Sequence, residues 1–140
     1  LPTLSALENV MLPLELSPRA GETQTAAHWL ARVGLGERVE HLPKQLSGGE
    51  QQRVAVARAF VTDPELVFAD EPTGNLDSRS SEEIVAILQS LNREQGLTVV
   101  VVTHEPDIGA STQRIITTRD GVVVSDEPVK NQRMALAGIG

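Results

Sequence analysis

Two short apolar runs on either side of an amphipathic stretch constrain the fold of this chain more than any other feature. The runs are Leu66–Ala69 and Thr98–Val102, and the second is β-branched throughout. The stretch between them closes at Gly96 and carries an apolar stripe at helical spacing, namely Ile84, Val85, Ile87, Leu88 and Leu91. This order predicts a parallel βαβ unit with a right-handed crossover, whose strands are covered on both faces.

Polar residues follow both predicted strands. Asp70 and Glu71 follow the first, and His104 follows the second with one residue between. In open α/β sheets ligands bind outside the carboxyl ends of the strands, so these side chains are expected at one common edge. A carboxylate there can hold Mg²⁺ through water, and a second can accept a proton from an attacking water. The alternative is a solvated acidic turn formed by Pro72 and Gly74.

A glycine pair opens another predicted helix. Ser47 and Glu50 have the spacing of a capping box, and Gly48 and Gly49 lie between them. The first N–H groups of a helix lack internal partners, and without a Cβ a phosphate can approach them closely. The alternative is a well-capped helix with no ligand.

These pieces occur in one fixed order that closely resembles the ATP-binding cassette (ABC) ATPases. Residues 46–53 resemble the signature motif of that family, and Leu66–Asp70 resembles the Walker B strand, with Glu71 at the catalytic glutamate position. Gly74–Asp77 resembles the D-loop and His104 the switch histidine. Residues 1–10 and 69–77 are most similar to the lipoprotein-release and macrolide-export subgroup.

The resemblance implies an α/β fold, part of a P-loop NTPase. A helical subdomain with the signature motif and its helix is expected over residues 1–60. Half of a RecA-like core follows over 61–126, consisting of the parallel βαβ unit and a C-terminal β-hairpin, and 127–140 form a tail. Asp120-Gly121 independently predicts the hairpin turn.

The resemblance also implies that ATP and Mg²⁺ are bound between two nucleotide-binding domains closed head to tail. The signature residues Ser47, Gly48, Gly49 and Glu50 would contact the ATP held by the partner domain. In its own site, this chain would position Mg²⁺ with Asp70 through water, polarise the attacking water with Glu71 and orient it with His104.

The D-loop residues Asn75 and Asp77 would carry signals across that dimer. The further partner implied is a transmembrane permease, which the ATPase would drive in export or lipoprotein release. The expected location is cytoplasmic, on the inner face of the cell membrane. A formal charge of −7 argues against a nucleic-acid partner, and the chain has no cysteine.

No Gly-x-x-x-x-Gly-Lys-Ser/Thr phosphate loop is present in these residues. The chain therefore resembles the C-terminal part of a longer domain, and we expect it to be inactive alone. The alternatives are a non-transport ABC ATPase, involved in DNA repair or translation, and a regulatory half-domain.

Further expectations concern packing. A helix through Leu4–Leu14 should end or kink at Pro13, and a second should span Glu22–Val33 with Trp29 in the core.

In the helix after Ser47, the inward residues are expected to be Val54, Ala55, Ala59 and Phe60. Arg53 and Arg58 are interpreted as helix-surface charges, and His28 and His41 as surface residues. A turn of helix is possible at Met134–Ala137.

Overall fold

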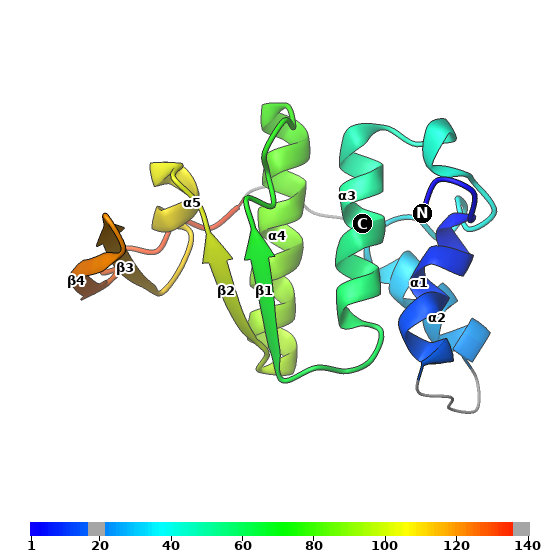
Figure 1. The fold of residues 1–140 in the computed structure, drawn as a ribbon, viewed down its shortest axis with the longest axis horizontal. Coiled ribbons are helices and arrows are strands. Elements are labelled where there is room, and N and C mark those ends of the chain that lie inside the picture. The colour runs from blue at the N-terminus through cyan, green and yellow to red at the C-terminus, as the bar shows by residue number, and fades with distance from the viewer. Residues whose placement is uncertain (17–21, 136–140) are drawn as a thin grey trace.

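The computed structural model describes residues 1–16 and 22–135, arranged along one long axis (Figure 1). Three helices occupy one end, a parallel strand pair with its crossover helix the middle, and a hairpin the other end. In chain order the elements are α1 (Ala6–Glu15), α2 (Glu22–Arg32), the 3-10 turn η1 (Pro43–Gln45), α3 (Gly48–Phe60), β1 (Leu66–Asp70), α4 (Ser78–Gln95), β2 (Thr98–Val102), α5 (Pro106–Ala110), β3 (Arg114–Arg119) and β4 (Val122–Pro128).

Side chains cap the N-termini of α1, α3 and α4, and α3 begins where the predicted capping box places it. The Ser5 hydroxyl accepts from the Glu8 amide, and the Glu8 carboxylate accepts from the Ser5 amide at 2.7 Å. Pro13 does not end α1, which continues to Glu15. This proline lies within the last turn, so its missing N–H removes a single hydrogen bond.

The α4 helix is closed at both ends by local chemistry. Asp77 accepts from the Ser80 amide at 2.7 Å at the N-terminus, and Gly96 takes a left-handed conformation, with φ of 66°, at the C-terminus. The predicted apolar stripe of this helix is buried.

β1 and β2 are parallel as predicted, with Leu66 opposite Thr98 and Asp70 opposite Val102. The apolar runs predict cover on both faces, and the described residues cover only one. Val67 is buried in the core, whereas Phe68 is 71 % exposed, because successive side chains point to opposite faces and α4 covers only one of them. Among the described residues, nothing buries the other face.

The α3 helix lies between α4 and the pair formed by α1 and α2 (Figure 1). Its buried face is therefore wide and includes Val56 and Ala57, whereas Ala59 is exposed, contrary to expectation. Trp29 lies in the core as predicted and stacks on Phe60 with ring centroids 5.7 Å apart.

Arg53 is not a free surface charge. Its Nη1 lies 2.9 Å from Oε2 of Glu83 on α4, and both side chains are largely buried. Among the other residues interpreted as surface, His28 is exposed and His41 is half-buried.

The predicted hairpin turns at Asp120 and Gly121, whose φ values of 52° and 76° suit a two-residue turn. β4 continues to Pro128, past the predicted end of the hairpin, because Arg114 still pairs with it. Residues 129–135 then return to the body of the protein. Met134 is not helical, and the last two residues of the turn of helix expected there lie outside the described part of the chain.

Candidate functional site

The loops after β1 and β2 bring Glu71 and His104 together, as their places at the carboxyl ends of parallel strands predict. The Nδ1 of His104 lies 2.7 Å from Oε1 of Glu71. The Glu71 amide donates to the carbonyl of Val102 at 2.8 Å, so the ladder between the strands extends to Glu71 itself. The His104 side chain is 86 % exposed, which leaves the pair open to solvent and ligands.

Glu71 has an unusual backbone conformation. Its φ of 46° is left-handed, a region that non-glycine residues occupy rarely and at a cost. The Gly74 amide donates to the Glu71 carbonyl at 3.0 Å and closes a tight turn through Pro72 and Thr73. This turn directs the chain away from the strand while the Glu71 side chain stays beside His104.

Asp70 ends β1 and is exposed. Its carboxylate makes no hydrogen bond or ion pair with any described residue, so it is available to a ligand. Within residues 1–16 and 22–135, no three His, Cys, Asp or Glu side chains gather into a metal site. One free carboxylate fits Mg²⁺, which keeps several waters and takes phosphate oxygens as further ligands, better than it fits a metal that needs several protein ligands.

At the segment that resembles the signature motif, both arms of the capping box form. The Ser47 hydroxyl accepts from the Glu50 amide at 3.1 Å, and the Glu50 carboxylate accepts from the Ser47 amide at 2.9 Å. That bond from the Ser47 backbone lowers the pKa of Glu50 below its ordinary value of 4.5, with help from Arg38 and Arg53.

The two glycines of this motif are in different environments. A Cβ on Gly49 would lie 2.6 Å from Oγ and 2.9 Å from Cβ of Ser80, so α3 and α4 need a glycine there to pack. A Cβ on Gly48 would meet only Leu76, at 3.6 Å, and Gly48 is exposed. Packing therefore explains Gly49 and leaves Gly48 unexplained.

The D-loop residues lie next to this helix tip. Asn75 is exposed with a left-handed φ of 64°. The side chain of Asp77 caps α4, and the bond from the Ser80 backbone N–H lowers the pKa of Asp77. Among the described residues, Ser47, Gly48 and Glu50 make no hydrogen bond or ion pair with Asp70, Glu71 or His104. The structure thus holds two separate groups of predicted site residues.

Sequence reasoning missed one polar contact in this region. Thr73 is 3 % exposed, and its hydroxyl donates to the Glu105 carboxylate at 2.7 Å. Both residues flank predicted site residues, and this adjacency was the only signal in the sequence.

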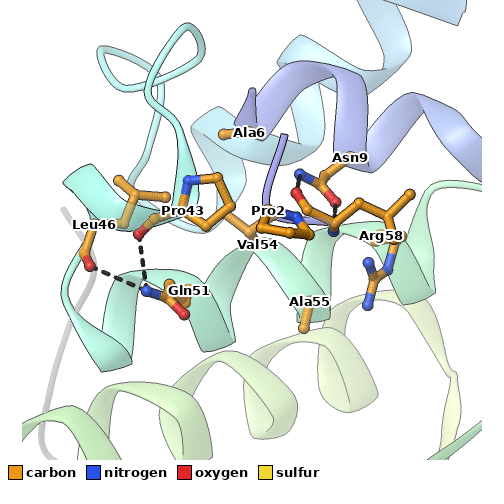
Figure 2. A pocket seen from close by; sticks show the side chains of 10 residues that line it. Pro2, Ala6, Asn9, Pro43, Leu46, Gln51, Val54, Ala55 and Arg58 are labelled. Atoms are coloured by element: carbon orange, nitrogen blue, oxygen red, sulfur yellow. Dashed lines mark hydrogen bonds between the residues drawn. The ribbon is translucent and has the colours of Figure 1, made fainter. Parts of the chain in front are cut away.

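A hollow of about 320 Å³ lies elsewhere, between α1 and the segment from η1 into α3. Figure 2 shows its lining, in which Gln51 donates to the carbonyls of Pro43 and Leu46. The buried amide of Asn9 donates to the carbonyl of Leu4 at 3.0 Å and fixes the turn before α1. None of the predicted site residues lines this hollow.

Comparisons with known proteins agree with the geometry. The profile of the ABC transporter family matches residues 1–74, more than half of the chain. The chain is 52 % identical over 127 residues to the macrolide export ATP-binding/permease protein MacB of Bdellovibrio bacteriovorus, covering 91 % of this chain and 19 % of that protein. It is 50 % identical over 127 residues to the lipoprotein-releasing system ATP-binding protein LolD of Syntrophus aciditrophicus, covering 89 % of this chain and 57 % of that protein.

The chain therefore spans about a fifth of MacB and somewhat over half of LolD. Among solved structures, the dimeric post-hydrolysis state of the ATP-binding cassette MJ0796, bound to ADP and Pi, superposes with a TM-score of 0.80 at 43 % identity. That match covers 93 % of this chain and 59 % of the cassette. None of the described helices has the length and apolar character required to cross a membrane. With more than half of its residues matched by the family profile and the cassette fold in its structure, this chain belongs to the ABC transporter family.

Proposed function

We propose that this chain is part of the ATP-hydrolysing subunit of an ABC transporter that powers export or lipoprotein release through a membrane permease. The observation that carries the proposal is the contact of 2.7 Å between Glu71 and His104 at the ends of two parallel strands, next to the free carboxylate of Asp70. A proton acceptor, a residue that orients it and a metal ligand are then adjacent, as phosphoryl transfer to water requires.

Each of these residues has a distinct role. Asp70 would hold Mg²⁺ through water, and the ion would supply positive charge to neutralise the phosphates. Glu71 accepts a proton from the attacking water or polarises it. His104 fixes the carboxylate of Glu71 through Nδ1. Its Nε2, which has no partner among the described residues, can accept from the water in the neutral ring and donate to the phosphate in the protonated ring. Phosphoryl transfer depends mainly on such positioning and charge stabilisation.

The signature group would act on a second nucleotide-binding domain. The N-terminus of α3 offers unpaired backbone N–H groups and a partial positive charge, and Gly48 leaves room for a phosphate to approach. Ser47 and Glu50 hold this helix tip through their capping box. Contact with ATP bound to the partner domain would explain why this group is separate from Glu71 and His104. The dimeric state of the related MJ0796 cassette supports this arrangement.

In this proposal the chain divides into a helical subdomain over residues 1–60, a core half over 61–126 and a tail over 127–140. The phosphate loop would come from another part of the full-length protein. The permease partner and a location on the inner face of the membrane are supported by the names of the related proteins, an ATP-binding/permease protein and a lipoprotein-releasing system. Asn75 and Asp77, next to the signature helix, would transmit closure between the two domains.

The test is Glu71→Gln in the native full-length protein. We expect ATP binding to persist and hydrolysis to slow by about 10²–10⁴-fold, because the amide cannot accept the proton. Glu65→Gln is the matched control, since Glu65 is an exposed carboxylate directly before the other end of β1. Hydrolysis at the native rate in Glu71→Gln would refute the proposed role.

A further inference from the structure

Two side-chain hydrogen bonds, rather than one, join the loops that follow β1 and β2. The first links Glu71 to His104 at 2.7 Å, and the second links Thr73 to Glu105 at 2.7 Å. Both bonds therefore connect the same pair of loops. The first joins the predicted site residues themselves, and the second joins residues one or two positions further along each loop. Only the first contains a residue with an assigned role in the proposed reaction.

The second bond is well placed to fix the geometry of the loops. Thr73 is 3 % exposed, so its hydroxyl has little access to water and depends on the Glu105 carboxylate as acceptor. A hydrogen bond to a charged acceptor is stronger than one between neutral groups.

Glu105 is itself fixed by its backbone. Its amide donates to the Thr103 hydroxyl at 3.0 Å, and its carbonyl accepts from the amides of Ile108 and Gly109 at the start of α5. The carboxylate that receives the Thr73 hydroxyl is therefore attached to a rigid part of the loop that also carries His104.

On the other side of the contact, Thr73 belongs to the turn that holds Glu71 in its left-handed conformation. Such a conformation persists only where its surroundings enforce it. Together these links form a closed ring. It runs along the chain from Glu71 to Thr73, crosses the hydrogen bond to Glu105, follows the chain back to His104 and returns through the hydrogen bond to Glu71. Within that ring, neither Glu71 nor His104 can rotate away without breaking a hydrogen bond.

We propose that Thr73 and Glu105 are positioning residues that hold Glu71 and His104 in register for hydrolysis, an inference that rests on the proposed function. Neither residue needs to touch the nucleotide. Their contribution is to orientation, and a displacement of about 1 Å in a reacting group can cost about 100-fold in rate. Loss of the bond should therefore lower kcat and leave ATP binding almost unchanged.

The experiment uses the native full-length protein and compares steady-state hydrolysis with ATP affinity. Thr73→Val removes the hydroxyl and keeps the shape of the side chain, and we expect kcat to fall by about 10- to 100-fold with KM within about threefold of the native value. Thr73→Ser keeps the hydroxyl donor, and Glu105→Gln keeps an oxygen acceptor. Each of these variants should therefore retain most of the native rate. The double variant Thr73→Val/Glu105→Leu should be no slower than Glu105→Leu alone, because both remove the same bond.

Thr112→Val is the matched control. This variant also loses side-chain hydrogen bonds, from the Thr112 hydroxyl to the carbonyls of Gly109 at 2.7 Å and Arg114 at 3.1 Å, but Thr112 lies outside the ring. Amide hydrogen exchange in the same proteins gives a readout that does not depend on turnover. We expect exchange at Gly74 to be faster by about tenfold or more in Thr73→Val and unchanged in Thr112→Val.

The outcomes separate this inference from the proposed function. If Glu71→Gln stops hydrolysis while Thr73→Val turns over at the native rate, only the inference is overturned. The same follows if Thr73→Ser fails to rescue, or if Thr112→Val lowers kcat as much as Thr73→Val. If Glu71→Gln hydrolyses ATP at the native rate, the proposed function is overturned and the inference with it.

Discussion

Gly49 on α3 lies so close to Ser80 on α4 that a Cβ on the glycine would stand 2.6 Å from the serine Oγ. The contact joins the first turn of α3, which begins at Gly48, to the first turn of α4, which begins at Ser78. The absence of a side chain at Gly49 is therefore a packing requirement, independent of any phosphate.

This contact predicts opposite behaviour for the two glycines. Gly49→Ala should destabilise the protein by about 1–3 kcal/mol, because overpacking outweighs the gain in helix propensity. Gly48→Ala should leave stability unchanged or slightly improved, since its Cβ would meet only Leu76 at an ordinary 3.6 Å. Urea unfolding checks both. If the clash is the cause, Ser80→Gly should restore the stability of Gly49→Ala, and failure to do so would contradict this explanation.

Gly48→Ala also tests the proposed ligand role of the N-terminus of α3. We expect this variant of the full-length protein to remain stable but to lose ATP-driven dimerisation, because a methyl group would keep phosphate from the backbone. Size-exclusion chromatography with and without Mg-ATP measures the effect. Normal dimerisation would show that the phosphate tolerates a Cβ at this position.

The capping box of α3 should give stability a defined pH dependence. Hydrogen bonding from the Ser47 backbone lowers the pKa of Glu50 in the folded state below 4.5. A lowered folded pKa adds stability above the unfolded pKa, and that stability is lost as pH falls through the folded value. The difference in unfolding free energy between the native protein and Glu50→Gln should therefore be constant near neutral pH and shrink below about pH 4.5.

Urea titrations at several pH values between 7 and 3.5 would measure this difference. Glu37→Gln is the control, because the exposed Glu37 carboxylate makes no hydrogen bond or ion pair with the described residues. A Glu50→Gln difference that stays the same across this range would contradict the assigned role of the charge.

The pair formed by Arg53 and Glu83 is a second link between α3 and α4, with side chains only 15 % and 19 % exposed. Arg53→Met should destabilise the protein by about 1–3 kcal/mol, because Glu83 would keep a partly buried charge with only the exposed Arg79 nearby. The buried Nε of Arg53 has no hydrogen-bond partner among the described residues, which reduces what the pair contributes. The double variant Arg53→Met/Glu83→Leu should therefore recover most of the loss, as a urea double-mutant cycle would show.

Gln89 on α4 forms hydrogen bonds with the C-terminal segment 129–135 and holds it against the body of the protein. Its buried amide donates to the carbonyls of Ser111 and Arg133 at 2.8 Å and accepts from the amide of Ala135 at 2.9 Å. Gln89→Met keeps the length of the side chain and removes all three bonds, so we expect a loss of about 1–3 kcal/mol and faster amide exchange at Ala135. Exchange at Val85, one turn earlier on the same helix, should change much less. Equal acceleration at both positions would indicate general unfolding.

Much of the fold could be predicted because its causes are local. The capping box of Ser47 and Glu50 placed the start of α3, and Asp120-Gly121 placed the hairpin turn. The two apolar runs, read as strands, and the rule for parallel crossovers brought Glu71 and His104 to one edge without knowledge of any contact.

The predictions that failed concern the burial of side chains, which depends on the elements that pack against them. The sequence predicts that Ala59 faces inward, but the neighbours of α3 leave that side exposed. Phe68 lies in a strand predicted to be covered on both faces, yet α4 covers only the other face. The helical pattern alone places Arg53 on the surface, because its partner Glu83 lies thirty residues away in sequence.

The sequence by itself determined where α3 starts, where α4 stops at Gly96, where the hairpin turns and which strand ends meet, since these follow from local backbone chemistry and the order of the elements. Only the tertiary structure decided that Gly49 is required by Ser80, that Arg53 has an ionic partner, and that Thr73 is bound to Glu105. Those facts depend on distances between segments far apart in the chain, and these distances are set by the packing of α3, α4 and the two loops in three dimensions.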